Sequence, residues 1–155
     1  MATLEFSLIL DAKKDELIKY ATDYERLPKY MPHQLQQCKI IENTKDGIIT
    51  EEIITFKTII NKTIHQQTLH KKFDNELYSI VISGPAKNTE VKVYFETINS
   101  QTKVIVNVNL NLNLSMKLLS PLIKKYYKMV FTSFLFRLNT DIIEQINMKQ
   151  STDKS

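Results

Sequence analysis

One segment of this sequence places an apolar side chain at every second position for eleven residues, from Val104 to Leu114. The positions between hold Ile105 and four asparagines, a pattern typical of an antiparallel strand with one buried face and one wet face. Ser120-Pro121 then opens a stretch free of glycine and proline, which predicts a helix over about 120–147. The strand would be roughly 37 Å long and the helix roughly 40 Å. A helix of this length can cover a curved antiparallel sheet from end to end.

The length and composition favour one domain. A chain of 155 residues with 43% hydrophobic content can bury a substantial core, and we expect a single domain over 1–147 and a polar, disordered tail over 148–155. The start of the chain lacks the features of a signal peptide, and the most apolar helical stretch, 126–138, is interrupted by Lys128. With its lone Cys38, the sequence therefore predicts a soluble, cytoplasmic protein.

The charge and the glycine count limit the classes of partner. The net charge is +4, but 21 basic and 17 acidic side chains make a mixed surface, so we expect no nucleic-acid partner and at most weak attraction to anionic surfaces. Gly47 and Gly84 are the only glycines, so the chain cannot build a glycine-rich loop for a nucleotide phosphate. We expect no cofactor.

The remaining patterns give the order of the elements. Alternating apolar residues over 4–10 predict a first strand, and Asp11 is a reasonable N-cap for a helix over about 12–27. Pro28 and Pro32 predict a short turn or irregular helical piece. Six hairpin-connected strands are then expected at about 35–43, 48–58, 62–73, 77–83, 89–98 and 102–114. This order, with about seven strands and a final helix, predicts an α+β helix-grip fold, in which a curved antiparallel sheet wraps a long C-terminal helix.

Two stretches resemble the START-like (SRPBCC) superfamily, in particular its polyketide cyclase and coenzyme Q-binding branch. Residues 23–32, read D-Y-E-R-L-P-K-Y-M-P, are similar to the pattern that follows the first helix in that branch, and 103–122 are similar to its last strand and the start of its long helix. His33 and Gln34 stand where the coenzyme Q proteins usually carry Trp and Cys. The resemblance implies binding of a hydrophobic small molecule, and only some members are enzymes.

The faces of the predicted elements indicate which side chains line a cavity between the sheet and the helix. We expect pocket lining from Phe56, His65, Tyr78, Phe95, Val108, Leu110, Tyr127, Phe131 and Phe134. His65 and His70 are five residues apart on one strand and so lie on opposite faces, which excludes a shared metal ion. His65 could point inward or lie at the surface, and Glu52 is a possible inward acid. The sequence predicts no catalytic nucleophile and no metal site.

The predicted C-terminal helix has a second apolar stripe, opposite the inward one. Leu122, Met129, Phe136 and Ile143 recur at intervals of seven, and Lys125 lies near them. Three explanations are open: coverage by the rest of the chain, a contact in a homodimer, and transient contact with an anionic membrane.

The leading hypothesis is a carrier or chaperone of a lipid, isoprenoid or quinone-like molecule, acting as a monomer or homodimer. An enzyme of the polyketide cyclase type is the second, and it requires Glu52 or His65 to meet a tyrosine inside the cavity. An interaction module on a ribosome or another protein is the third, and it would have a filled core without a pocket and an exposed basic or apolar patch.

Overall fold

The computed structural model describes residues 2–57 and 61–153. Their elements follow in the order β1 (Ala2–Leu10), α1 (Lys14–Ala21), the 3-10 helix η1 (Tyr24–Lys29), β2 (Leu35–Thr44), β3 (Gly47–Phe56), β4 (Lys62–Lys72), β5 (Glu76–Ser83), β6 (Glu90–Ile98), β7 (Gln101–Leu110), α2 (Leu114–Lys117) and α3 (Ser120–Asp153). Residue 58, in the second of the six expected strands, lies outside the described residues. The predicted α+β class and element order are confirmed.

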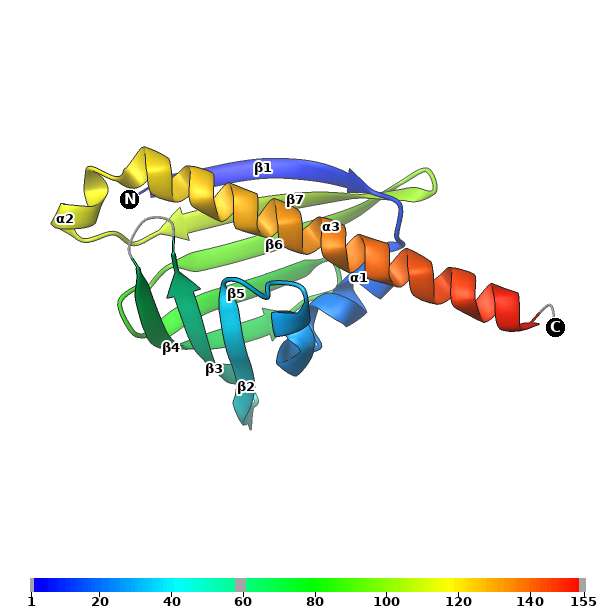
Figure 1. Cartoon of the computed structure of the whole chain (residues 1–155), viewed down its shortest axis with the longest axis horizontal. Coiled ribbons are helices and arrows are strands. Elements are labelled where there is room, and N and C mark those ends of the chain that lie inside the picture. Colours follow the sequence, from blue (N-terminus) through cyan, green and yellow to red (C-terminus); the bar gives the residue numbers. More distant parts are fainter. Residues whose placement is uncertain (1, 58–60, 154–155) are drawn as a thin grey trace.

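The described strands form one seven-stranded antiparallel sheet in the order β1-β7-β6-β5-β4-β3-β2. The chain crosses from one edge of the sheet to the other between β1 and β2, and α1 and η1 make this connection (Figure 1). Register shifts in the pairing of β2 with β3, and of β4 with β5, mark irregularities that bend and twist strands. The sheet is curved, and α3 runs diagonally across its inner face (Figure 1). This is the arrangement of a helix-grip fold.

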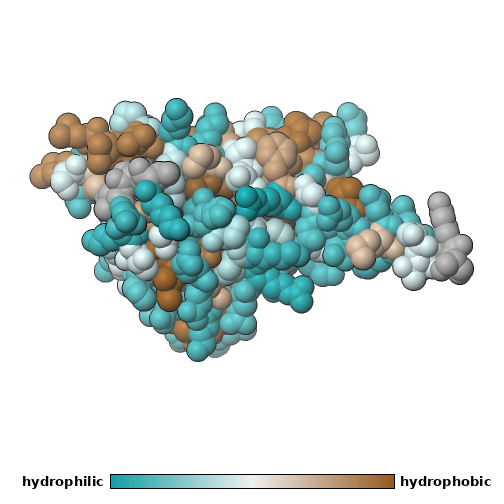
Figure 2. All heavy atoms as spheres, in the orientation of Figure 1, coloured by the Kyte–Doolittle hydropathy of each residue, from teal (hydrophilic) through white to brown (hydrophobic). Residues whose placement is uncertain are grey.

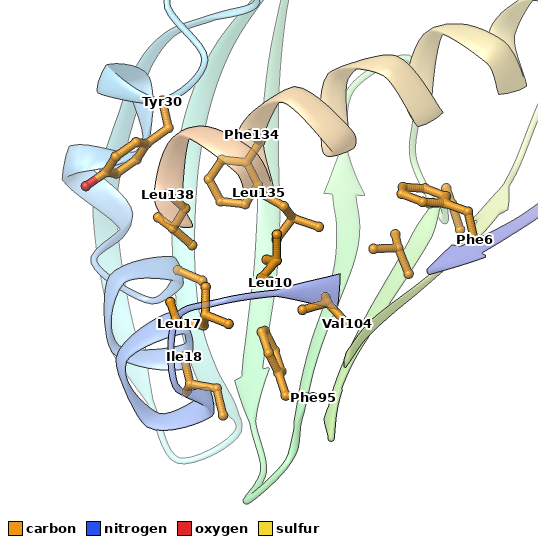
Figure 3. Close-up of a cluster of buried hydrophobic side chains, with 14 of the residues drawn as sticks. Phe6, Leu10, Leu17, Ile18, Tyr30, Phe95, Val104, Phe134, Leu135 and Leu138 are labelled. Atoms are coloured by element: carbon orange, nitrogen blue, oxygen red, sulfur yellow. The ribbon is translucent and has the colours of Figure 1, made fainter. Parts of the chain in front are cut away.

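The core lies where β1, β7 and β6 meet α1 and the middle of α3. Apolar side chains of β1 and β7 face inward together because the register pairs Phe6 with Val106 and Leu8 with Val104. Figure 3 shows them packing with α1 and α3, and Val104 and Leu138 are fully buried. Each such leucine or valine contributes about 1.5–3 kcal/mol through burial, so this end of the sheet is firmly joined to α3.

The first helix differs from its prediction. We expected one helix over 12–27 with Asp11 as N-cap, but α1 covers only Lys14–Ala21, and Lys13 is the N-cap, without a side-chain bond. Asp11 instead accepts a hydrogen bond from Gln101 at 2.8 Å. The chain leaves the α-helix at Thr22 and continues as η1, which buries Tyr24 against the start of β2. Burial of this side chain, a tertiary effect, therefore divides the predicted helix.

The last strand and the last helix also end at other residues than the sequence predicted. β7 stops at Leu110, not at 114, because Asn113 caps α2 by accepting a hydrogen bond from the Met116 amide at 2.9 Å. Leu114, expected on the inner face, is consequently 82% exposed. At the other end, 148–153 continue α3 in place of the expected disordered tail, and 154–155 lie outside the described residues.

Candidate ligand-binding cavity

A cavity of about 230 Å³ lies between α3 and the inner face of β3 to β6. Its walls are mainly apolar and aromatic, and η1 and the residues after it close one end. Six of the residues that we expected to line a cavity do so: Phe56, Tyr78, Phe95, Tyr127, Phe131 and Phe134. Their contact with a ligand stays a prediction.

Three of the expected lining residues lie elsewhere. His65 is exposed on the outer face of β4, and Val108 and Leu110 are buried in the core beside the cavity without lining it. The inner face of β4 carries Gln66 and His70, together with Thr68. The sequence pattern predicted the wrong inner face for β4, because the apolar Leu69 and Phe73 share the face of His65. That face is the outer one, and Phe73 is 54% exposed.

An aromatic cluster from β3 and the start of α3 forms part of the cavity wall. The rings of Phe56 and Tyr126 lie 5.5 Å apart, and those of Tyr126 and Tyr127 lie 6.4 Å apart. Tyr127 continues to Phe131, with ring centroids 6.4 Å apart and nearly parallel. Burial raises the pKa of Tyr127 to about 12, so its hydroxyl stays protonated. Tyr126 was not among the predicted lining residues.

A carboxylic acid is buried in the part of the cavity wall that β3 forms. Oε1 of Glu52 accepts hydrogen bonds from Thr68 Oγ1 at 2.5 Å and from Gln66 Nε2 at 2.8 Å. Within 2–57 and 61–153, no donor is bonded to Oε2 and no cation pairs with the carboxyl group. Burial raises the pKa of Glu52 above its usual range, although the two hydrogen bonds oppose this. Glu52 therefore offers the cavity one oxygen that can accept a hydrogen bond or, when protonated, donate one.

The polar partners of Glu52 come from the neighbouring strand. The register of β3 and β4 places Glu52 opposite Gln66, with Thr68 two residues further along β4. The sequence pointed to Glu52 as an inward acid but not to Gln66 or Thr68. Pairing Glu52 with its cross-strand neighbours would have found them, once the register of the hairpin was known.

A second polar group in the cavity is His70. Its Nε2 lies 2.8 Å from Thr50 Oγ1, its Nδ1 lies 2.7 Å from Ser79 Oγ, and its ring stacks on Tyr24 with centroids 4.4 Å apart. Burial lowers the pKa of His70 to about 4, so the imidazole is neutral at pH 7. Since both ring nitrogens are engaged by hydroxyl groups, His70 holds β3, β4 and β5 together and has no nitrogen free for proton transfer.

Tyr78 and Tyr24 are two further polar residues of the cavity wall. The Tyr78 hydroxyl donates to Glu90 Oε1 at 2.8 Å, and burial together with this bond raises the pKa of Tyr78 to about 12. Burial also raises the pKa of Tyr24 to about 12. Both phenols are neutral at physiological pH. Glu52 is therefore the group of this cavity that can change its charge most readily.

The described part of the chain gives two negative findings. No group of three or more His, Cys, Asp or Glu residues within it is arranged to hold a metal ion. None of its helices is long and apolar enough to cross a membrane.

A long C-terminal helix held by a curved antiparallel sheet over an apolar cavity defines the START-like helix-grip fold, and this chain has that fold. A START superfamily protein from Mycobacterium smegmatis is similar at a TM-score of 0.78 and 14% identity, over 94% of this chain and 99% of that one. A protein of Thermus thermophilus reaches 0.79 at 15% identity, over 92% and 98% of the two chains.

The Zhui aromatase/cyclase from a Streptomyces species is a third structural relative, with a TM-score of 0.73 and 7% identity over 93% of this chain and 94% of that one. Sequence comparison adds nothing to these likenesses: no known family profile and no curated protein matches the chain. At such low identities the similarity establishes the fold. The function has to be argued from the cavity.

Proposed function

We propose that this protein binds and carries a hydrophobic small molecule in the cavity between α3 and the sheet. The observation that carries the proposal is the cavity itself: about 230 Å³ of space behind aromatic and aliphatic side chains, in a fold whose core is otherwise well packed. Empty apolar space of this size is costly to keep, because its walls lose the dispersion contacts that close packing would give. A ligand would restore these contacts.

The dimensions of the cavity favour a small ligand. Sites for drug-sized molecules measure about 300–1,000 Å³, so about 230 Å³ suits a single or fused aromatic ring, or a short isoprenoid. Burying about 300 Å² of its hydrocarbon surface at about 25 cal/mol/Å² would contribute roughly 7 kcal/mol before ordering costs. Without those costs, about 7 kcal/mol corresponds to a dissociation constant of roughly 10 μM, so apolar burial alone supports weak binding and needs no catalytic machinery.

Glu52 gives the ligand an orientation. Its Oε1 is occupied by Thr68 and Gln66, so Oε2 is the atom that a ligand hydroxyl or carbonyl would meet. Most of the other lining residues are aromatic or aliphatic, among them Phe56 and Tyr126, whose rings lie 5.5 Å apart. The proposed ligand is therefore apolar along most of its length and carries one hydroxyl or carbonyl group.

A tryptophan reporter tests the proposal, because the chain contains no tryptophan of its own. In the variant Phe131→Trp the new indole lies in the cavity wall, whereas in Met129→Trp it lies on the outer side of the same helix, at a position that is 52% exposed. Titration with 2-naphthol, geraniol and a short-chain benzoquinone should change the emission of F131W saturably and leave that of M129W unchanged. Equal responses of the two variants, together with no retained compound in native mass spectrometry, would refute the carrier function.

The role of Glu52 has its own test. Wild-type protein should bind 2-naphthol about tenfold more tightly than naphthalene, as expected for one hydrogen bond to a charged or strongly polar group. Since Thr68 and Gln66 hold Oε1, Glu52→Gln puts an amide NH2 group, which donates but cannot accept a hydrogen bond, in place of Oε2, so the preference for a hydroxyl that donates should fall. A preference that survives in E52Q would remove Glu52 from the binding site.

An enzyme of the polyketide cyclase type remains a second candidate. The observation in its favour is that Glu52 shares the cavity with Tyr127, close enough for its charge to contribute to the raised pKa of that phenol. The named aromatase/cyclase with the same fold agrees with this candidate. A poly-β-ketone thioester should then yield cyclised product, detected by mass spectrometry, and E52Q should abolish the turnover; product formed equally by E52Q would exclude this mechanism.

The cavity weighs against an interaction module, for which we expected a filled core. We also propose that the protein is cytoplasmic. A free thiol such as that of the buried Cys38 is typical of proteins in a reducing compartment.

A further inference from the structure

Four leucines lie at the surface between the end of β7 and the first turn of α3. Leu118 is 88% exposed, Leu114 82%, Leu122 49% and Leu119 39%. We call them the leucine patch, and Figure 2 shows hydrophobic residues gathered at the end of the molecule where α2 and the start of α3 lie. A contiguous apolar cluster of this kind is unusual on a surface that meets only water.

The fold does not need the two most exposed of these leucines, Leu114 and Leu118. Within the same segment Met116 packs against the core, and Asn113 caps α2. Leu114 and Leu118 make so few contacts that polar residues could replace them without loss of packing. Their side chains therefore have to be explained by something outside the molecule.

The charge of the segment that carries the leucine patch is of one sign. Between Glu96 and Asp141 the sequence contains no acidic residue but five lysines and one arginine. Lys117 and Lys125 are exposed within the segment that carries the leucines, and Lys124 is half-buried beside them.

The β3–β4 hairpin adds two more cations. Phe56, at the end of β3, contacts Tyr126 of α3, so Lys57 and Lys62 at this end of the hairpin lie close to the start of α3. Both are exposed. Lys128, in contrast, turns toward the ring of Phe6 and lies outside this group. Lysines of α2 and α3 thus lie within the segment that carries the leucine patch, and those of the hairpin lie near the second turn of α3.

The combination of exposed leucines and nearby lysines favours one kind of binding partner for the leucine patch. A second copy of the chain, related by a two-fold axis through the patch, would bring the lysines of the two copies together, which is unfavourable. An anionic bilayer offers apolar chains below a layer of negative headgroups, which matches leucines that protrude near lysines. The same end of the molecule holds the Phe56 and Tyr126 wall of the cavity.

We propose that the leucine patch inserts into the interface of a membrane that contains anionic lipids, with Lys117 and Lys125 on the headgroups and the aromatic wall of the cavity facing the bilayer. The sequence had singled out Leu122, Lys125, Met129, Phe136 and Ile143 for a contact with a membrane or in a dimer. Ile143 instead packs against the core, and Met129 and Phe136 are half-exposed further along α3. Leu122 and Lys125 keep their place in the proposal, and Leu114, Leu118 and Leu119 join them.

Vesicle co-sedimentation tests the proposal without any cavity ligand, so it can fail or succeed independently of the carrier function. Full-length protein is mixed with vesicles of phosphatidylcholine alone, or with about 30% phosphatidylserine. Binding should require phosphatidylserine and should weaken with salt. Leu114→Ser with Leu118→Ser should reduce the binding constant at least about tenfold, since each leucine loses its apolar contact. Lys117→Glu with Lys125→Glu should reduce it at least about tenfold as well.

Matched controls separate the patch from general effects. Phe73→Ser removes an apolar side chain that is 54% exposed between β4 and β5, and it should bind like wild type. Lys39→Glu with Lys45→Glu changes the net charge as much as the lysine double variant, but on β2 and the turn after it, and should also bind nearly as well.

Circular dichroism confirms that each variant is folded. The proposal is overturned if wild-type protein does not sediment with phosphatidylserine vesicles, or if all variants bind equally. It is also overturned if sedimentation velocity shows a dimer that L114S/L118S converts to a monomer while vesicle binding is unchanged.

Discussion

His70 makes the stability of this protein depend on pH in a way that one substitution should remove. Its imidazole is buried in the cavity wall between Thr50 and Ser79, and burial alone lowers its pKa from 6.5 to about 4. The folded protein therefore resists protonation of a group that the unfolded chain protonates readily. His70→Gln abolishes this titration while keeping an amide that can form hydrogen bonds.

The direction and the size of the change in stability with pH follow from this lowered pKa of His70. Above pH 6.5 the imidazole is neutral in both states and contributes its full stability. As the pH falls from 6.5 toward 4, the unfolded chain binds a proton that the folded protein does not, and stability is lost. At about 1.4 kcal/mol for each pH unit, the loss reaches about 2 kcal/mol at pH 5 and about 3 kcal/mol below pH 4.

Urea denaturation at pH 7.5, 6 and 5 measures the effect. The free energy of unfolding of the wild type relative to H70Q should fall by about 2 kcal/mol between pH 7.5 and pH 5, because the carboxyl groups common to both proteins cancel. His33→Gln and His65→Gln are the controls, since both histidines are exposed and their curves should parallel the wild type. If H70Q also parallels the wild type, the buried, neutral state assigned to His70 is wrong.

Three further substitutions or treatments probe the packing. Leu138→Ala, at a fully buried position facing the sheet, should lower the free energy of unfolding by about 2–5 kcal/mol in a urea titration. Met148→Ala is the control, at a position that is 63% exposed, and should change this free energy by less than about 0.5 kcal/mol. Gly47→Ala should lower the melting temperature markedly, because the backbone there has φ of +144° and a Cβ would clash with the His70 carbonyl oxygen. Lys45→Ala, in the same turn, is the control and should leave the melting temperature nearly unchanged. Burial raises the pKa of Cys38 to about 12, so iodoacetamide at pH 8 should leave this thiol unmodified until urea unfolds the protein, and rapid alkylation in native buffer would contradict the buried position.

The long elements were predictable because their patterns are strong and local. The alternation over β7 placed Val104 and Val108 on one face, and both are buried there. The helix pattern placed Tyr127 and Phe131 toward the sheet, and both line the cavity. In each case many residues repeat the same period, so one exception does not change the interpretation.

The shorter and less regular patterns were read less well. β4 carries apolar residues on both faces, and its inner side was assigned to His65 when it belongs to His70. The alternation through Leu114 continued for four residues beyond the end of β7, because the asparagines that fit a wet strand face also fit a helix cap at Asn113. Local composition is compatible with both structures there, and only the packing of the following helix selects one.

The residue pattern alone is enough to predict a two-faced antiparallel sheet that holds one long helix, since periods of two and 3.6 residues fix which side chains share a face. The inward face of β4, the donors that meet Glu52 and the leucines that stay exposed depend on how the elements pack together. A buried carboxyl group is tolerated only where partners reach it, and those of Glu52 come from a neighbouring strand through the register of the hairpin. The spacing of apolar residues fixes which side chains share a face of one strand or helix. The pairing between strands and helices fixes which other side chains that face contacts.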